Sequence, residues 1–386
     1  MIEEEFLPFA KPTISESAIA EVVETLRSGW LTTGPKVKKF EEMLSEYHGG
    51  RHVLCVSSAT AGLHLALLSL GLKEGDEVIT TPLTFVATLN TITQAGGKPV
   101  LADIDPNTLN ISPANIEAAI TSRTKAIVPV HYAGLPCDMD AISNLAKKHN
   151  LRVVEDCAHA VGAAYKGQRI GSYGDIQVIS FHPNKNITTG EGGAIITNDD
   201  AVISSVERLR FHGIDRNAFN RFSKAGSQQY DVVMPGFKYN MMDIQAALGI
   251  HQLPELEGFI EKRTKFAQRY LDILGGWSKL TLPQAPSYFH SHAWHLFTVR
   301  LNNNAAGIDR DGLINAMKAE NIGIGLHYQS THIFTYYSKK YGWKPDDFPN
   351  SLAAGENILS LPLFPTMTTH EQDRVIKALE KVLKKG

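Results

Sequence analysis

The sequence lacks the features that mark several large classes of protein. It has only three cysteines, Cys55, Cys137 and Cys157, and no two of them have the C-x-x-C spacing of a zinc or redox motif. A disulfide framework and a metal site are therefore not expected, and the cysteines should be small buried side chains. The formal net charge is only −2, so no basic field attracts nucleic acid or an anionic membrane.

Long apolar runs are also missing. No run approaches the roughly 20 residues that are needed to span a bilayer. The first residues, MIEEEFLPFAKP, are acidic where a secretory signal would be basic, and they contain no apolar segment of the kind such a signal carries. We find no internal repeat, low-complexity stretch or long linker. We therefore expect a cytoplasmic globular protein with no nucleic-acid or membrane partner.

The dominant pattern is an alternation of short apolar runs with segments of helical period from residue 15 to residue 200. Such alternation predicts an α/β fold with a mostly parallel central sheet, covered on both faces by helices. Beyond residue 200 helical segments prevail, as in a smaller α+β domain. Because 386 residues exceed the roughly 100–200 of a typical domain, we expect a large domain with an N-terminal arm over residues 1–250 and a small C-terminal domain over residues 251–386. The predicted strands of the first part are residues 52–56, 77–80, 98–102, 126–130, 152–155, 176–181 and 193–197.

Three polar clusters follow predicted strands of this sheet, and ligands of open α/β sheets bind at the carboxyl ends of the strands. Residues 57–62 read SSATAG ahead of an apolar helix, where free backbone N–H groups favour an anion such as phosphate. Asp156 ends another strand, and Lys185 follows a third, ahead of the glycine-rich turn TTGEGG. Taken singly, residues 57–62 are as readily a helix cap, Asp156 a turn aspartate, and Lys185 a solvated surface lysine.

The combination points to one chemistry. A phosphate cradle, a carboxylate that keeps a pyridine nitrogen protonated, and a lysine that forms a Schiff base and moves protons are the parts that pyridoxal 5'-phosphate requires. A lysine in that role needs a pKa well below its usual value of about 10.4, which partial burial can supply. We therefore expect this cofactor to be bound at Lys185.

Ordered motifs along nearly the whole chain resemble the DegT/DnrJ/EryC1/StrS nucleotide-sugar aminotransferases, which have the fold type I (aspartate aminotransferase-like) architecture. The motifs that carry the resemblance are SGWLTTGP (28–35), SSATAG (57–62), GDEVITTP (75–82), PVHYAG (129–134), EDCAHA (155–160), SFHPNK (180–185) and GFKYN (236–240). Members that dehydrate sugars have histidine at the Schiff-base position, so Lys185 favours transamination.

The resemblance assigns Lys185 as the catalytic residue and implies a homodimer with shared active sites, because Asn240 would reach the cofactor phosphate of the second subunit. Phe85 occupies the position of the ring that stacks on the cofactor, where tryptophan is expected, and Pro183 is a second departure. For the sugar nucleotide we expect Trp30, which could equally be a core residue, with Thr32, His327 and His332. The expected cofactor-binding residues are Ala59, Thr60, Phe85, Asp156, His159, Ser180, Lys185 and Asn240.

The resemblance further implies a substrate. The stretches FLPF (6–9), HAWH (292–295), GLH (325–327) and LPLFP (361–365) are similar to the subgroup that converts a UDP-linked 4-keto pentose into UDP-4-amino-4-deoxy-L-arabinose for lipid A and lipopolysaccharide modification, which gives antibiotic resistance. L-Glutamate would be the donor and 2-oxoglutarate the by-product. A 4-keto-6-deoxy hexose linked to UDP, GDP or dTDP is the alternative substrate. A non-catalytic regulator that retains the fold is a more remote alternative.

Overall fold

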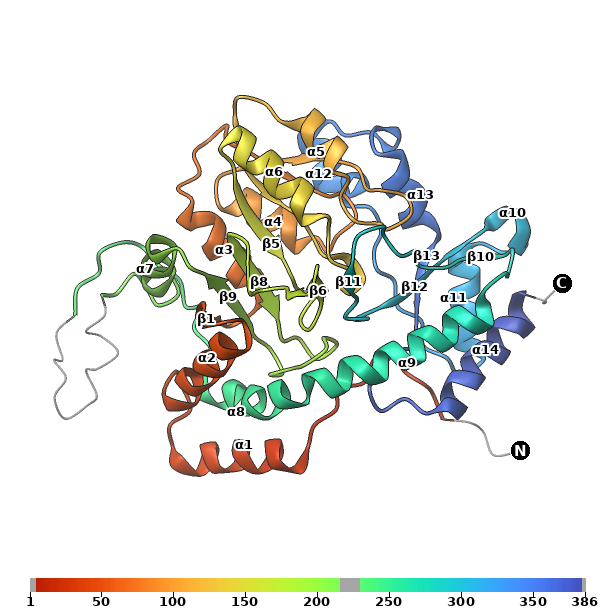
Figure 1. The fold of residues 1–386 in the computed structure, drawn as a ribbon, viewed down its shortest axis with the longest axis horizontal. Coiled ribbons are helices and arrows are strands. Elements are labelled where there is room, and N and C mark those ends of the chain that lie inside the picture. Colours follow the sequence, from red (N-terminus) through yellow and green to blue (C-terminus); the bar gives the residue numbers. More distant parts are fainter. Residues whose placement is uncertain (1–4, 216–229, 384–386) are drawn as a thin grey trace.

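A computed structural model of the chain describes residues 5–215 and 230–383. Its centre is a seven-stranded sheet in the order β1-β9-β8-β5-β4-β2-β3 (Figure 1). Only β9 runs antiparallel to its neighbours; the other pairs are parallel. The predicted mostly parallel α/β sheet is therefore confirmed. Its strands are β1 (His52–Val56), β2 (Glu77–Thr80), β3 (Lys98–Leu101), β4 (Thr124–Val128), β5 (Arg152–Asp156), β8 (Ile176–Ser180) and β9 (Gly193–Thr197).

Helices cover both faces of this sheet. On one face α3 (Ala59–Ser69), α4 (Ala87–Gln94) and α7 (Asp200–Leu209) pack over Leu54, Val56 and Val178. On the other face α2 (Pro35–Tyr47), α5 (Pro113–Ala119), α6 (Met139–His149) and α8 (Asp243–Gln252) pack over residues such as Cys55 and Ile179. Because the sheet is buried on both sides, its central strands read as continuous apolar runs, and their bounds were predicted to within about two residues.

The first helix, α1 (Glu16–Ser28), shows how local sequence sets the bounds of an element. The Ser15 side chain accepts a hydrogen bond from Ala18 N–H at the start of the helix. Gly29 ends it in the left-handed conformation, with φ 73°. Serine before a helix and glycine just after it are the residue types that favour these two ends.

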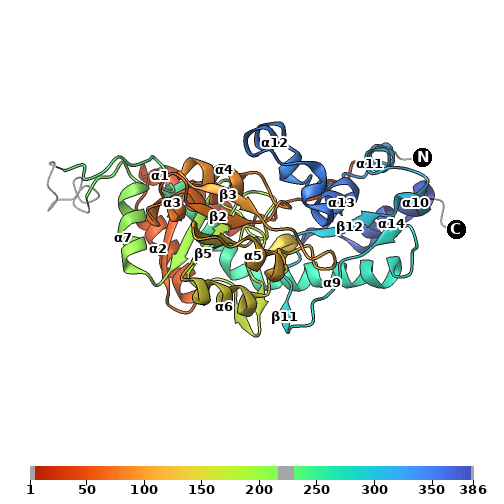
Figure 2. The same ribbon diagram turned by 90° about the horizontal axis from the view of Figure 1, so that it is seen from above.

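The C-terminal part is built on a second, three-stranded sheet of β10 (Leu280–Thr281), β12 (Phe297–Leu301) and β13 (Ile358–Leu361). The long helix α9 (Leu256–Leu274) runs from below the large sheet to this one, and Figure 2 shows the two sheets at opposite ends of the molecule. A buried apolar cluster unites α9, β12 and β13. The remaining helices here are α10 (Asn303–Ala306), α11 (Arg310–Ala319), α12 (Thr335–Tyr341), α13 (Pro349–Asn357) and α14 (Thr369–Leu383).

A third small sheet was not predicted. It joins β6 (Ala164–Tyr165) and β7 (Gln168–Arg169) to β11 (His290–Ser291), and strands of two residues carry no readable period. The boundary at residue 250 between a large and a small domain stays a prediction. None of the helices within the described ranges has the length and apolarity to cross a bilayer. The three cysteines are buried and unpaired, as expected.

Candidate active site

A cavity of about 460 Å³ lies at the carboxyl edge of the large sheet, beyond the last residues of β5 and β8. Eight of the residues expected from the sequence line it, namely Ala59, Thr60, Phe85, Asp156, His159, Ser180, Lys185 and His327. They come from the ends of, or the segments after, four different strands (β1, β2, β5 and β8), and from a C-terminal loop at residues 326–328. The three polar clusters of the sequence thus meet in one place.

Asp156 is the last residue of β5, and its carboxylate is nearly fully buried at 5% exposure. One oxygen accepts a hydrogen bond from Thr88 Oγ1 at 2.9 Å, and the other accepts one from Ala158 N–H at 3.1 Å. Burial raises the pKa of this carboxyl, and these two hydrogen bonds offset only part of the shift. A carboxylate offers about four lone-pair sites, so Asp156 has room for a further donor such as a protonated ring nitrogen.

Lys185 is partly buried and faces a histidine. Its Nζ lies 3.4 Å from Nε2 of His295. Burial lowers the pKa of Lys185 to about 8, although the nearby charge of Asp156 acts in the opposite direction. Because desolvation disfavours the ammonium form, the amino group is poised between its protonated and neutral forms near neutral pH.

The backbone that presents Lys185 is a tight turn. Lys185 N–H donates to His182 O at 2.9 Å, which closes a four-residue turn over residues 182–185. Pro183 is therefore the second residue of that turn, a position where its fixed φ is favoured and where no N–H is needed. This departure from the family pattern fits the local geometry without strain.

The N-terminus of helix α3 has the geometry of an anion site. The Ser58 side chain accepts from Ala61 N–H at 3.1 Å, whereas the N–H groups of Ala59 and Thr60, in the first turn, have no acceptor within the helix. Gly193 makes this arrangement possible, because a Cβ there would lie 2.6 Å from Ala59 N. Backbone N–H groups at a helix N-terminus, beside the Ser180 hydroxyl, suit a phosphate group.

Sequence reasoning missed three residues of the site. Thr88 holds Asp156, as described above. His295 faces Lys185, and its Nδ1 is buried without a hydrogen-bond partner among the described residues. Tyr328 lies with its hydroxyl 2.9 Å from His159 Nε2 and its ring 6.0 Å from that of Phe85. His295 stood within a family motif of the sequence, but nothing in the sequence showed that it would reach Lys185.

The two imidazoles near Lys185, those of His159 and His295, favour the neutral form. Burial, together with the charge of Lys185, holds the pKa of both His159 and His295 well below the usual value. Their rings are 4.5 Å apart. Phe85, which precedes α4, is 57% exposed at the rim of the cavity, where a flat ring is free to cover a ligand.

Four expected residues do not line this cavity. Trp30 Nε1 donates to Thr33 O at 3.2 Å, Thr32 O accepts from Asp243 N–H at 3.2 Å, and the Asn240 amide donates to Thr33 Oγ1 at 2.6 Å. These three residues thus gather around the segment between α1 and α2. His332 also lies outside this cavity, and its buried ring lies 2.7 Å from Ser330 Oγ and 2.9 Å from Pro345 O.

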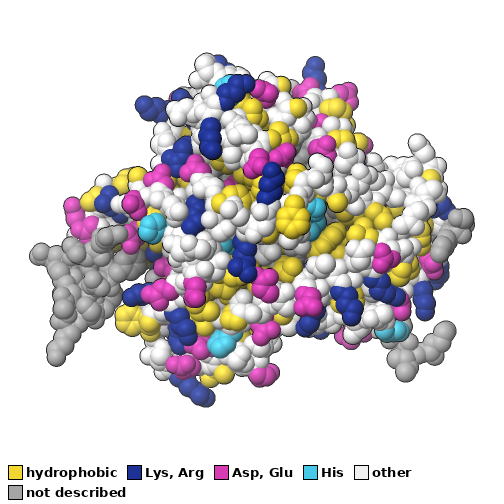
Figure 3. Space-filling view, in the orientation of Figure 1, with side chains coloured by type: hydrophobic (Ala, Val, Ile, Leu, Met, Phe, Trp, Pro, Cys, Tyr) yellow, Lys and Arg dark blue, Asp and Glu magenta, His cyan; other side chains and the backbone are white. Residues whose placement is uncertain are grey.

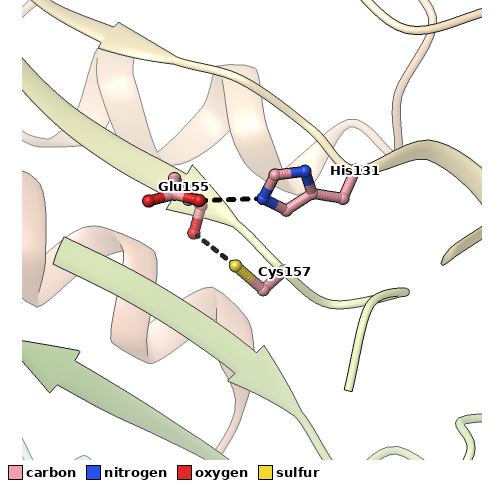
Figure 4. Close-up of side chains that lie close together, drawn as sticks. All are labelled: His131, Glu155 and Cys157. Atoms are coloured by element: carbon pink, nitrogen blue, oxygen red, sulfur yellow. Dashed lines mark hydrogen bonds and ion pairs between the residues drawn. The ribbon is translucent and has the colours of Figure 1, made fainter. Parts of the chain in front are cut away.

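A second polar group lies beneath the site and could be taken for a metal centre. Ligand atoms of His131, Glu155 and Cys157 lie within 4.8 Å of one another, fully buried (Figure 4). Cys137 N–H donates to His131 Nδ1, so the ring proton is on Nε2, which donates to Glu155 at 3.0 Å. Cys157 directs its thiol to the Glu155 carbonyl at 3.5 Å, and burial raises the pKa of that thiol. These bonds explain the group as a hydrogen-bonded network.

The lowered pKa of Lys185 can be measured in the cofactor-free protein. Acetylation by acetic anhydride requires the neutral amine, so modification of Lys185 should rise with pH and reach half its maximum near pH 8. In urea the same lysine should titrate near the ordinary value of about 10.4. Asp156→Asn should move the folded midpoint lower, since the charge of Asp156 favours the ammonium. Peptide mass spectrometry provides the readout, and equal midpoints with and without urea would contradict the burial argument.

Comparison with known proteins assigns the chain to a family. The model of the DegT/DnrJ/EryC1/StrS aminotransferase family matches residues 12–380. The spore coat polysaccharide biosynthesis protein SpsC of Bacillus subtilis is 46% identical over 383 residues, which cover 98% of this chain and 97% of that protein.

Solved structures agree with this family assignment. The sugar aminotransferase Spr1654 of Streptococcus pneumoniae, in its PMP form, superposes with a TM-score of 0.90 at 34% identity, covering 98% of this chain and 99% of that one. Spr1654 has also been solved in its PLP form. Helicobacter pylori PseC, an aminotransferase involved in the biosynthesis of pseudoaminic acid, gives a TM-score of 0.91 at 28% identity, covering 98% of this chain and 100% of that one.

Proposed function

The chain belongs to the DegT/DnrJ/EryC1/StrS family of pyridoxal-phosphate-dependent sugar aminotransferases, and we propose that it transfers the amino group of L-glutamate to C4 of a 4-keto sugar nucleotide. One observation carries the proposal, which is that Lys185, Asp156 and the N-terminus of α3 line a single cavity. The three differ in chemistry, and together they match the amine, the ring nitrogen and the phosphate of one cofactor. A non-catalytic regulator would have no need to keep all three.

When bound, pyridoxal phosphate supplies an electron sink that makes a proton on the neighbouring carbon removable. In our proposal Lys185 holds the cofactor through Nζ, then takes a proton from Cα of the donor and later delivers one to C4 of the sugar. Asp156 keeps the ring nitrogen protonated. The α3 N–H groups of Ala59 and Thr60, with Ser180, hold the phosphate.

The side chains at the mouth of the cavity complete the proposed site. Phe85 covers one face of the cofactor ring, and His159, fixed by Tyr328, lies against the ring as well. The imidazole of His159 and the phenol of Tyr328 carry no charge in this proposal, so they exclude water without adding charge beside Lys185. His327, which lines the same cavity, is placed to contact the sugar.

We also propose a homodimer. Asn240, Trp30 and Thr32 lie around Thr33, outside the cavity of their own chain, and in a dimer Asn240 would reach the cofactor phosphate of the second chain. Trp30 is 45% exposed, together with Leu31 and Met242 nearby in the same part of the molecule. Sedimentation equilibrium of the holoenzyme should give twice the mass of 42.4 kDa.

For the acceptor we propose a UDP-linked 4-keto pentose, which would yield UDP-4-amino-4-deoxy-L-arabinose for lipid A and lipopolysaccharide modification, with the antibiotic resistance that such modification confers. The similarity of the N-terminal and C-terminal stretches to that subgroup supports this choice. The alternative acceptor is a 4-keto-6-deoxy hexose nucleotide, which differs by one methyl-sized group. Such a group changes discrimination by only about 1–3 kcal/mol, or roughly 10–200-fold.

The acceptor can be identified by a half-reaction. The enzyme is first converted to its pyridoxamine form with L-glutamate, and 4-keto sugar nucleotides are then added one at a time while the absorbance of the aldehyde form returns. We expect the UDP-4-keto pentose to react at least ten-fold faster than UDP-, GDP- or dTDP-linked 4-keto-6-deoxy hexoses. A faster hexose would overturn the pentose assignment alone. A colourless protein that takes up no added cofactor would overturn the aminotransferase proposal itself.

A further inference from the structure

A second cavity, of about 270 Å³, adjoins the wall of the first. Its floor and sides come from η1 (Tyr132–Gly134), from α9 and from β12. Tyr132 donates to the His327 carbonyl at 2.5 Å, and Ala133 N–H donates to His159 Nδ1 at 3.3 Å. Figure 3 shows the hollow over α9, lined with hydrophobic side chains. The two cavities therefore share a wall, although no residue is common to both linings.

Arg300, from β12, lines this second cavity and is partly buried. Within residues 5–215 and 230–383, no side chain or carbonyl forms a hydrogen bond or ion pair with its guanidinium. Tyr132 and Asp105 influence it only electrostatically, and burial lowers the pKa of Arg300. A charge removed from water is ordinarily paired, because its desolvation is otherwise uncompensated.

Three arginines that are more deeply buried than Arg300 show the usual solution. Arg51 donates to four backbone carbonyls and to the Gln177 amide oxygen. Arg210 donates to Glu41 and to Cys55 O, both at 2.7 Å. Arg263 donates to three backbone carbonyls, of which Leu363 O is nearest at 2.9 Å. Arg300 differs from these three, because it is partly buried, lines a cavity and donates to no acceptor among the described residues.

The rest of the lining is suited to a flat apolar body. The rings of Trp294 and His292 stack at 3.9 Å with an interplanar angle of 2°, and Leu271 and Leu296 lie on other sides. Burial lowers the pKa of His292 to about 3, so this ring adds no charge. Arg300 is then the cationic group that this cavity offers, beside the hydroxyl of Thr298.

We propose that this cavity binds a small organic carboxylate, with the carboxylate on the Arg300 guanidinium and a flat apolar body between Trp294 and Leu271. A volume of about 270 Å³ is at the lower end of small-molecule sites, so a sugar nucleotide does not fit. Such a ligand would contact Tyr132 and Ala133, and through them the backbone of His327 and the ring of His159. The inference does not depend on which sugar the enzyme aminates.

The test is calorimetric titration of the holoenzyme with benzoate, and with benzamide as its neutral counterpart. We expect one benzoate per chain, bound at least ten-fold more tightly than benzamide. Arg300→Gln should weaken benzoate binding by about ten-fold or more, in line with a lost charge-assisted hydrogen bond, and should leave benzamide unchanged. Arg27→Gln, an exposed arginine of α1, is the control and should bind benzoate like the wild type.

Two outcomes would overturn the proposal. One is equal benzoate binding by wild type and Arg300→Gln. The other is competition between benzoate and 2-oxoglutarate with no effect of Arg300→Gln, which would place benzoate in the Lys185 cavity. If Arg300→Gln does not fold, Leu271→Trp decides the matter. That variant fills the cavity while keeping Arg300, and it should abolish benzoate binding; retained binding would contradict the site.

Discussion

Lys185→Ala is expected to lower kcat of the transamination by about four orders of magnitude or more, because in the proposed mechanism one amino group both holds the cofactor and moves the proton, and proton transfer alone contributes up to roughly 10⁴-fold. The geometry leaves no obvious substitute. The nearest basic side chain, His295, has its ring nitrogen 3.4 Å from Lys185 Nζ, and burial keeps the pKa of that imidazole well below its usual value. Stopped-flow measurement of the half-reaction with L-glutamate gives the rate.

The same variant has a readout that does not depend on turnover. Borohydride should fix the cofactor covalently to the wild-type chain, at the peptide that contains Lys185, and should fix none to Lys185→Ala. Lys38→Ala, an exposed lysine of α2 paired with Glu42, is the matched control and should behave like the wild type in both measurements. A cofactor fixed to a different lysine in the wild type would show that the assignment of Lys185 is wrong.

Glu155→Ala is expected to destabilise the fold by roughly 2–6 kcal/mol, because two buried donors lose their acceptor and each such loss costs about 1–3 kcal/mol. His131 Nε2 donates to one carboxylate oxygen at 3.0 Å, and Gln177 Nε2 donates to the other at 2.6 Å. Gln177 is in turn bound by Arg51, so the loss would spread along the network beneath the site. Urea unfolding of the cofactor-free protein, followed by circular dichroism, measures the effect.

A matched glutamate shows what burial contributes to that effect. Glu117 is paired with one partner, Lys148 at 2.7 Å, and its side chain is 52% exposed. Glu117→Ala should therefore shift the unfolding midpoint little, since exposed ion pairs are screened by water. If Glu155→Ala were as mild as Glu117→Ala, the network in Figure 4 would not be the stabilising element inferred here.

The sequence predicted the large sheet well, for a physical reason. Strands such as β8 and β9 are buried at every residue, so each reads as one apolar run, and polar residues begin where the strand ends. That same transition revealed Asp156 and Lys185. The prediction was weaker where an element is short, as for β6 and β7, whose two residues each are too few to show a period.

Sequence reasoning could not predict contacts between segments that are far apart along the chain. His295 faces Lys185 across 110 residues, and Tyr328 meets His159 across 169. His327 and His332 looked equivalent as a pair in the sequence, yet one lines the cavity and the other is enclosed by Ser330 and Pro345. The loop that carries them turns away from the cavity within five residues, and local composition gives no sign of it.

The antiparallel strand β9 has a consequence for how this enzyme can change over evolutionary time. Because β9 returns directly beside β8, one hairpin carries both Lys185 and Gly193, the residue that lies close to Ala59. The residues of a chain that are proposed to hold its own cofactor thus all belong to the large sheet and its connections, between Ala59 and Gly193, whereas the opposite wall, with His295, His327 and Tyr328, comes from a segment more than 100 residues after Lys185. Selection can therefore remodel that wall, and with it the choice of sugar, while the inherited cofactor chemistry stays intact.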